Sequence, residues 1–221
     1  MSRLKTLDQI LETGVVAIVR LQSSDRLLEV ARAIAAGGVT AIEFTMTTPG
    51  AIDTLARAAG ELGEDVVLGA GTVLDGPTAR AAILSGARFI VSPTLSRETI
   101  EMCHRYDVVV IPGAYTPTEI LTAWEFGADL VKVFPATGLG PRYFKDVLAP
   151  LPQVRLVPTG GVDLHTAGPF IDAGAVAIAV GSNLVDPRAI ASGEFDSLTE
   201  TARAFRAAVD AARSARRDRG S

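Results

Sequence analysis

The sequence contains few of the residues from which metal sites and disulfides are built. Its 221 residues include one cysteine, Cys103, and two histidines, His104 and His165. A single cysteine forms no internal disulfide, and two histidines on expected outer helices do not make the site of a zinc-dependent enzyme. The charged segment MSRLKTLDQILETG is no signal peptide, and no run of eighteen apolar residues follows it. We expect a cytoplasmic protein without a membrane span, metal or cofactor.

Neither sign of charge is in large excess, because 21 Lys and Arg stand against 25 Asp and Glu, a net charge of −4. Nucleic-acid binding uses clustered basic residues with interleaved aromatics. The one dense basic cluster, ARSARRDRG at residues 212–220, contains no aromatic residue. We interpret it as a solvated helix end, with residues 216–221 as a disordered tail, and expect no nucleic-acid partner.

Eight short apolar runs, rich in β-branched residues, alternate with segments of helical periodicity. At 23.1 kDa, the chain fits a single domain. Strands that are apolar throughout are buried on both faces, and strict alternation with helices indicates parallel crossovers. We predict a closed eight-stranded parallel (β/α)8 TIM barrel at residues 14–215, with an extra helix at residues 1–13. The runs begin at residues 15, 41, 66, 88, 108, 130, 155 and 177.

A glycine pair in GAGT, Gly69 and Gly71, does not indicate a dinucleotide site. The third glycine of that fingerprint would fall at position 74, which is Leu74, and the segment follows the third strand rather than the first. We interpret these glycines as permitting a tight exit from the strand, and the open doubly wound sheet as the weaker alternative.

A lysine lies in the middle of one apolar run, GADLVKVFPAT. Lys132 would be buried without a partner if it faced the helices, so an inward orientation is expected. Glu43 has the matching central position in AIEFT, and Arg20 ends the first strand. The pair could be a core ion pair, which does little for stability. Alternatively, burial and a nearby cation would favour the free amine, a nucleophile for carbonyl carbons, with Glu43 transferring protons.

Two glycine-rich segments follow the last two expected strands. PTGG covers residues 158–161 and VGSNLV covers residues 180–185. Barrels of this kind bind phosphate with these two loops, because glycine lets backbone N–H groups approach an anion. We therefore predict a phosphate site there, to which the Ser182 hydroxyl contributes.

These segments resemble the bacterial 2-keto-3-deoxy-6-phosphogluconate aldolases, also called KHG/KDPG aldolases, along nearly the whole chain. The motifs that carry the resemblance are VVAIVR, GGVTAIEFT, GAGTVL, FIVSPTL, IPGAYTPTE, LVKVFPA, VRLVPTGGV and VGSNLV. The resemblance implies a class I aldolase, usually a homotrimer, that forms pyruvate and glyceraldehyde 3-phosphate. It implies that Lys132 is the Schiff-base lysine, Glu43 the acid/base residue and Arg20 the carboxylate ligand. It places Thr72, Pro93 and Phe134 in the pyruvyl pocket, and Thr159, Gly160, Gly161, Gly181 and Ser182 at the phosphate.

One position departs from part of this family. Some members carry an arginine in the loop after the glutamate strand, where this chain has Thr47 in TMTTPGA. Thr47 is retained as a candidate substrate contact. Three alternatives stay open: cleavage of the galactonate epimer, additional activity on 4-hydroxy-2-oxoglutarate, and a phosphate-binding isomerase or epimerase in which Lys132 acts only electrostatically.

Overall fold

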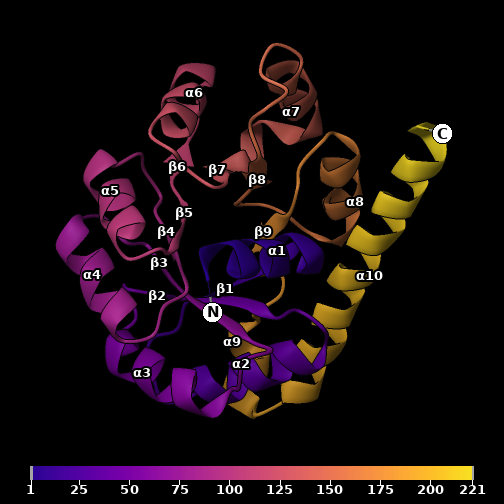
Figure 1. The fold of residues 1–221 in the computed structure, drawn as a ribbon. Coiled ribbons are helices and arrows are strands. Elements are labelled where there is room, and N and C mark those ends of the chain that lie inside the picture. Colours follow the sequence, from indigo (N-terminus) through magenta and orange to yellow (C-terminus); the bar gives the residue numbers. More distant parts are fainter. Residues whose placement is uncertain (1, 221) are drawn as a thin grey trace.

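The computed structural model describes residues 2–220 and shows alternating strands and helices. Figure 1 shows the strands grouped at the centre, with most helices around the outside. The strands are β1 (Val15–Val19), β2 (Ala41–Thr45), β3 (Val67–Gly71), β4 (Phe89–Val91), β5 (Val109–Ile111), β6 (Gly113–Ala114), β7 (Val131–Val133), β8 (Leu156–Pro158) and β9 (Ile178–Val180). The α-helices are α1 (Arg3–Thr13), α2 (Leu27–Ala36), α3 (Ala51–Glu61), α4 (Gly76–Leu84), α5 (Arg97–Arg105), α6 (Pro117–Glu125), α7 (Gly140–Leu148), α8 (Leu164–Asp172), α9 (Pro187–Ser192) and α10 (Phe195–Gly220). The expected α/β class is confirmed.

The paired strands are parallel and form two sheets, with orders β5-β4-β3-β2-β1-β9 and β6-β7-β8. β5 and β6 come from one expected strand that Pro112 divides, because proline has no N–H for the hydrogen-bond ladder. An isolated bridge between Thr159 and Ala179 links the end of β8 to β9. The hydrogen-bonding pattern therefore differs from the single closed eight-stranded sheet expected from sequence.

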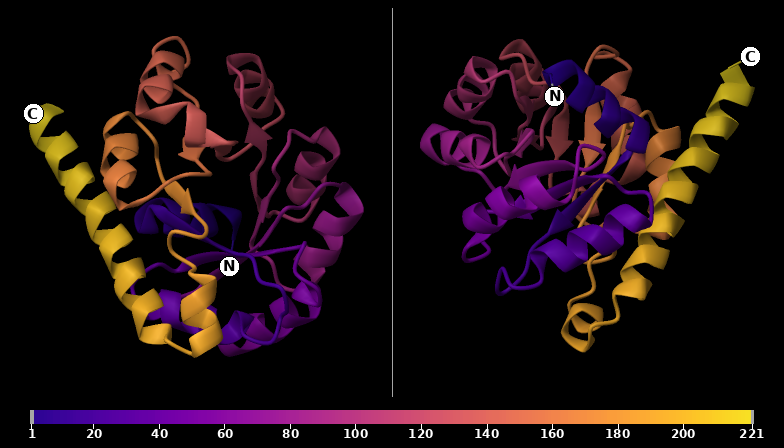
Figure 2. Two further views of the ribbon diagram at one scale, coloured as in Figure 1. Left: turned by 180° about the vertical axis from the view of Figure 1, so that it is seen from behind. Right: turned by 60° about the horizontal axis from the view of Figure 1, so that its bottom comes forward.

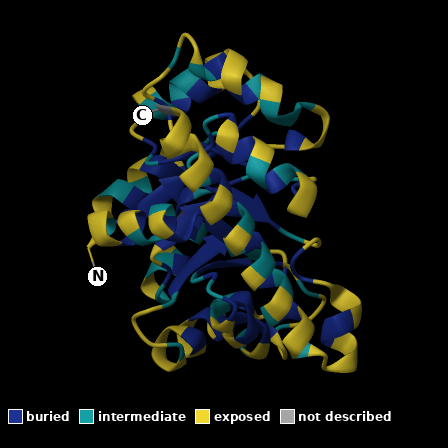
Figure 3. Ribbon diagram, turned by 90° about the vertical axis from the view of Figure 1, so that its right-hand side faces the viewer, coloured by how far each residue is buried: buried dark blue, intermediate teal, exposed yellow. Residues whose placement is uncertain are grey.

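The apolar core has two parts, on the two sides of the strands. One lies between the strands and the outer helices, and Figure 3 shows the outer helix faces exposed. The other lies inside the strands, where Leu7 and Ile10 of α1 pack against Val16, Val67 and Val109. These strand residues lie at or near the N-terminal ends of their strands, so α1 covers that end. The opposite end, where the strands terminate, is left for the loops.

Side-chain caps fix the start of several helices directly after these loops. Asp75 accepts a hydrogen bond from the Thr78 N–H at the start of α4, and Asp163 accepts one from the Thr166 N–H at the start of α8. Such caps satisfy N–H groups that have no partner within the helix. Each cap also marks the residue at which the loop ends and the helix begins.

The C-terminal helix α10 packs against α8 and α2 (Figure 2). It continues through residues 216–220, for which the sequence predicted a disordered tail, and Ser221 lies outside the described residues. In this segment Arg219 forms an ion pair of 2.5 Å with Asp172 of α8. Within residues 2–220, no helix has the length and apolar character needed to cross a membrane.

Arg213 of α10 joins both ends of the chain. Its guanidinium donates to the backbone oxygens of Leu11 and Glu12, at the end of α1, and of Val176, before β9, at 2.6 to 2.9 Å. We expect Arg213→Met to lower the free energy of unfolding by about 2–3 kcal/mol, because a charged donor and its part-buried acceptors lose their bonds. Urea unfolding measures this, with Arg142→Met on exposed α7 as the control. Equal losses in the two variants would contradict the role of Arg213.

Candidate active site

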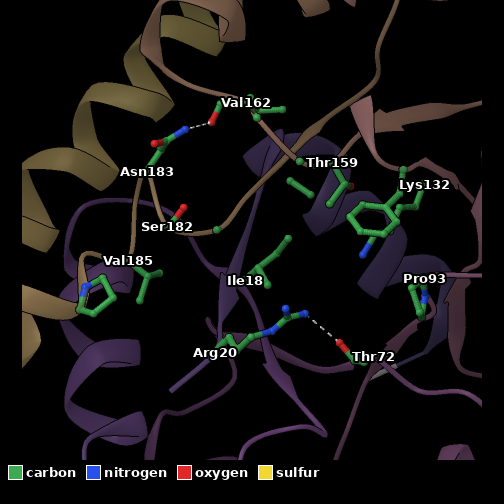
Figure 4. A pocket seen from close by; sticks show the side chains of 16 residues that line it. Ile18, Arg20, Thr72, Pro93, Lys132, Thr159, Val162, Ser182, Asn183 and Val185 are labelled. Atoms are coloured by element: carbon green, nitrogen blue, oxygen red, sulfur yellow. Dashed lines mark hydrogen bonds between the residues drawn. The ribbon is translucent and has the colours of Figure 1, made fainter. Parts of the chain in front are cut away.

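A cavity of about 320 Å³ opens at the C-terminal ends of the strands (Figure 4). Its size is at the lower end of the range for small-molecule sites. Of the residues expected at the site, all but Glu43 and Thr47 line it: Arg20, Thr72, Pro93, Lys132, Phe134, Thr159, Gly160, Gly161, Gly181 and Ser182. The remaining lining residues are Ile18, Val162, Ala179, Asn183, Val185 and Pro187.

The Lys132 side chain points into the cavity from the centre of β7. Its neighbours Val131 and Val133 pack in the outer core, as the two-residue period of a strand requires. Lys132 is 6% exposed, and its Nζ lies 4.9 Å from the centre of the Phe134 ring. Burial lowers the pKa of Lys132, as does the nearby Arg20, while Glu43 opposes the shift. The site therefore favours a neutral amine.

Glu43, at the centre of β2, is 1% exposed. Burial raises the pKa of its carboxyl, against the opposing charges of Lys132 and Arg20. Its buried Oε2 has no hydrogen-bond partner within residues 2–220, and no ion pair within 4.0 Å joins it to Lys132. The two groups interact electrostatically without contact, so the interpretation as a satisfied core ion pair is wrong.

Arg20 and Thr72 form a polar pair at the cavity wall, where Arg20 Nη2 donates to Thr72 Oγ1 at 3.2 Å (Figure 4). Thr72 has φ +56°, a left-handed conformation that β-branched residues seldom adopt. Such local strain is characteristic of functional sites. The pair presents a guanidinium and a hydroxyl to the cavity, a combination suited to a carboxylate.

The glycine-rich loops after β8 and β9 form the other side of the cavity. Gly160 and Gly161 have φ +91° and +73°, which glycine adopts without strain. Asn183 Nδ2 donates to the Val162 oxygen at 2.8 Å and so ties the two loops together. The N–H groups of Gly161 and Ser182 donate to no other group in the described part of the chain. These free donors are suited to an anion.

Asn183 could not be predicted from its place in VGSNLV, because an amide that ties two loops together has no signal in a single sequence. Thr47 is exposed outside the cavity lining, and its hydroxyl donates to Thr45 Oγ1 at 3.1 Å. His104 contacts the Gly127 oxygen at 3.0 Å, away from the cavity. No cluster of His, Cys, Asp and Glu in residues 2–220 has the arrangement of a metal site.

Sequence comparison connects this cavity to a reaction class, because the family model for KDPG and KHG aldolases matches residues 7–201. The chain belongs to this aldolase family. This aldolase is therefore a carbon–carbon lyase, and the alternative of an isomerase or epimerase is not supported.

Three relatives show how far the similarity extends. This aldolase is 38% identical to the 2-dehydro-3-deoxy-phosphogluconate aldolase of Treponema pallidum, over 84% of this chain and 88% of the relative. It is 33% identical to the 2-dehydro-3-deoxy-6-phosphogalactonate aldolase of Escherichia coli K12, over 77% and 83%. The KDPG aldolase of Legionella pneumophila, solved with pyruvate captured at low pH as a covalent carbinolamine, superposes with TM-score 0.83 at 27% identity over 90% and 97%.

Proposed function

We propose that this aldolase cleaves 2-keto-3-deoxy-6-phosphogluconate to pyruvate and glyceraldehyde 3-phosphate through an imine on Lys132. The observation that carries the proposal is the buried Lys132 amine of lowered pKa, which faces a cavity with a carboxylate-binding pair on one side and free N–H donors on the other. The covalent pyruvate adduct of the Legionella relative supports a Schiff-base, or class I, reaction.

The reaction begins when neutral Lys132 Nζ attacks the C2 carbonyl carbon and gives a carbinolamine. Glu43 supplies the proton with which the hydroxyl leaves as water, and a protonated imine remains. Glu43, directly or through a water, then takes the proton of the C4 hydroxyl. The C3–C4 bond breaks, the aldehyde leaves, and the bonding electrons pass into the imine to give an enamine. Glu43 returns the proton to C3, and hydrolysis releases pyruvate.

The cavity walls bind the two ends of the substrate. Arg20, paired with Thr72, holds the pyruvyl carboxylate. Pro93 and Phe134 enclose the pyruvyl carbons beside Lys132, and water exclusion there keeps the amine neutral. The phosphate binds at the glycine-rich loops, to the free N–H groups of Gly161 and Ser182 and to the Ser182 hydroxyl. Gly160 and Gly181 line the same part of the cavity.

Reductive trapping tests the imine directly. Borohydride added with pyruvate should inactivate the enzyme and leave a reduced three-carbon adduct that peptide mass spectrometry maps to Lys132. Borohydride without pyruvate is the control and should leave activity unchanged. Inactivation with the adduct on another lysine, or no adduct at all while cleavage proceeds normally, would overturn the proposal.

The galactonate epimer is a second candidate substrate, because the Escherichia coli relative that acts on it is 33% identical to this chain. The two substrates differ in configuration at C4, so the ratio of kcat/KM on the two epimers decides between them. We propose the gluconate epimer as the better substrate, and 4-hydroxy-2-oxoglutarate as a weaker one because it lacks the phosphate. A higher kcat/KM on the galactonate epimer would reverse the assignment.

Thr159 supplies a buried hydroxyl to the cavity. The residue is 2% exposed, lines the cavity, and its Oγ1 forms no hydrogen bond within residues 2–220. We expect Thr159→Val, of similar shape, to lower kcat/KM by about 10–100-fold through loss of a bond to a substrate oxygen. The melting temperature should stay equal or rise, because an unpaired buried hydroxyl is removed. A lower melting temperature with unchanged kcat/KM would show a structural role instead.

We also propose that the two sheets close into one eight-stranded barrel within a single domain. The continuous chain through Pro112 and the Thr159–Ala179 bridge support closure. A homotrimer in the cytoplasm is proposed from the family resemblance. Light scattering should then give about three times the chain mass of 23.1 kDa. A monomer at micromolar concentration would rule the trimer out.

A further inference from the structure

Gly71, the last residue of β3, lies against the Glu43 side chain. A Cβ built on Gly71 would overlap Glu43 Oε1 and would lie 2.6 Å from its Cδ and 3.2 Å from its Cγ. These three nearest atoms all belong to Glu43. Gly71 is not among the glycines with positive φ, so its backbone conformation does not require glycine. The missing side chain therefore leaves space that the Glu43 carboxyl occupies.

The other glycine of GAGT has a different neighbour. Gly69 pairs with Glu43 in the register of β2 and β3, but a Cβ there would lie 2.5 Å from the Phe89 ring. Gly69 thus makes room for a core aromatic ring, while Gly71 makes room for a carboxyl. The tight strand exit inferred from sequence does not account for this difference.

Little else in the described chain holds the Glu43 carboxyl in place. No hydrogen bond from residues 2–220 reaches it, and its charge partners do not contact it. Its position therefore depends on steric contacts, and the bare Gly71 backbone leaves room for the carboxyl. We propose that Gly71 is a positioning residue that places Glu43 for proton transfer. This inference rests on the proposed role of Glu43 in the aldol cleavage.

A double-mutant cycle between Gly71 and Glu43 tests the proposal. Gly71→Ala should lower kcat by about 100-fold, because a carboxyl displaced by about 1 Å transfers protons poorly, while KM changes less than about threefold. Exchange of the pyruvate methyl protons with D2O should fall in parallel. In a Glu43→Asp background, the shorter carboxyl avoids the new methyl group, so the same alanine should cost less than about threefold.

The control is Gly60→Ala, on α3, where a Cβ meets nothing within 4 Å. It should retain the parent kcat. A cost of Gly71→Ala that is equal in both backgrounds, or no cost in either, would overturn the positioning role. If Gly71→Ala alone fails to fold, folding rescued by Glu43→Asp supports the role, and misfolding in both backgrounds contradicts it. Borohydride trapping of the parent enzyme at Lys132 tests the proposed function separately.

Discussion

Lys132→Met should lower kcat for aldol cleavage by at least about 10⁴-fold and abolish the borohydride-trapped pyruvate adduct. Methionine keeps the length of the side chain but has no nucleophilic nitrogen, so no imine forms. In the parent enzyme, the rate of trapping should rise with pH through the lowered pKa of Lys132, with a midpoint below the ordinary lysine value of 10.5. Rapid-quench trapping at a series of pH values measures this midpoint.

The loss in Lys132→Met should be chemical rather than structural. The pKa of Lys132 is lower in the folded state than in the unfolded state, so this group lowers the free energy of unfolding at neutral pH. The destabilisation disappears as pH rises toward the ordinary lysine value of 10.5. The variant should therefore have an equal or higher melting temperature near neutral pH. Lys145→Met, on the exposed face of α7, is the matched control and should retain both activity and trapping. An active Lys132→Met enzyme would contradict the mechanism.

Glu43→Gln should lower kcat by about 10²–10⁴-fold, the range for loss of a general acid/base. The carboxamide has the size of the carboxyl but cannot carry the proton between carbinolamine, C4 hydroxyl and C3. Exchange of pyruvate methyl protons with D2O, followed by NMR, isolates the C3 step and should fall by a similar factor. Glu101→Gln, which changes an exposed carboxyl on α5, is the control.

Glu43→Gln should also change how the stability of the protein depends on pH. The pKa of Glu43 is raised in the folded state, so the stability linked to this group is present below 4.5 and is lost as pH rises through the folded pKa. Glutamine does not titrate. The melting temperature of Glu43→Gln should therefore exceed that of the parent increasingly as pH rises above 4.5. A difference that shrinks with rising pH would contradict the raised pKa.

The sequence predicted the orientation of Lys132 because a strand has a period of two and a buried lysine facing apolar helices is costly. The same period placed Glu43 inside the strands. Hydrogen bonding around Pro112 differed from expectation, since a single sequence does not show whether a proline ends a ladder or interrupts it.

Other features depend on contacts between distant residues and could not be predicted from spacing. The Thr47 hydroxyl donates to Thr45, and the last residues of α10 include the Arg219–Asp172 ion pair. The reason for a glycine at position 71 is visible only when the position of the Glu43 side chain is known. Sequence reasoning thus identified the reactive groups better than the contacts that orient them.

The guanidinium of Arg213 fastens the last turns of α10 to the end of α1, at the side of the strands that α1 covers. Substrate enters from the other side, where the strands terminate. A surface linker or affinity handle attached at either terminus would accordingly project away from the entrance. Immobilised through such a handle, the enzyme should turn over at the rate of the free protein.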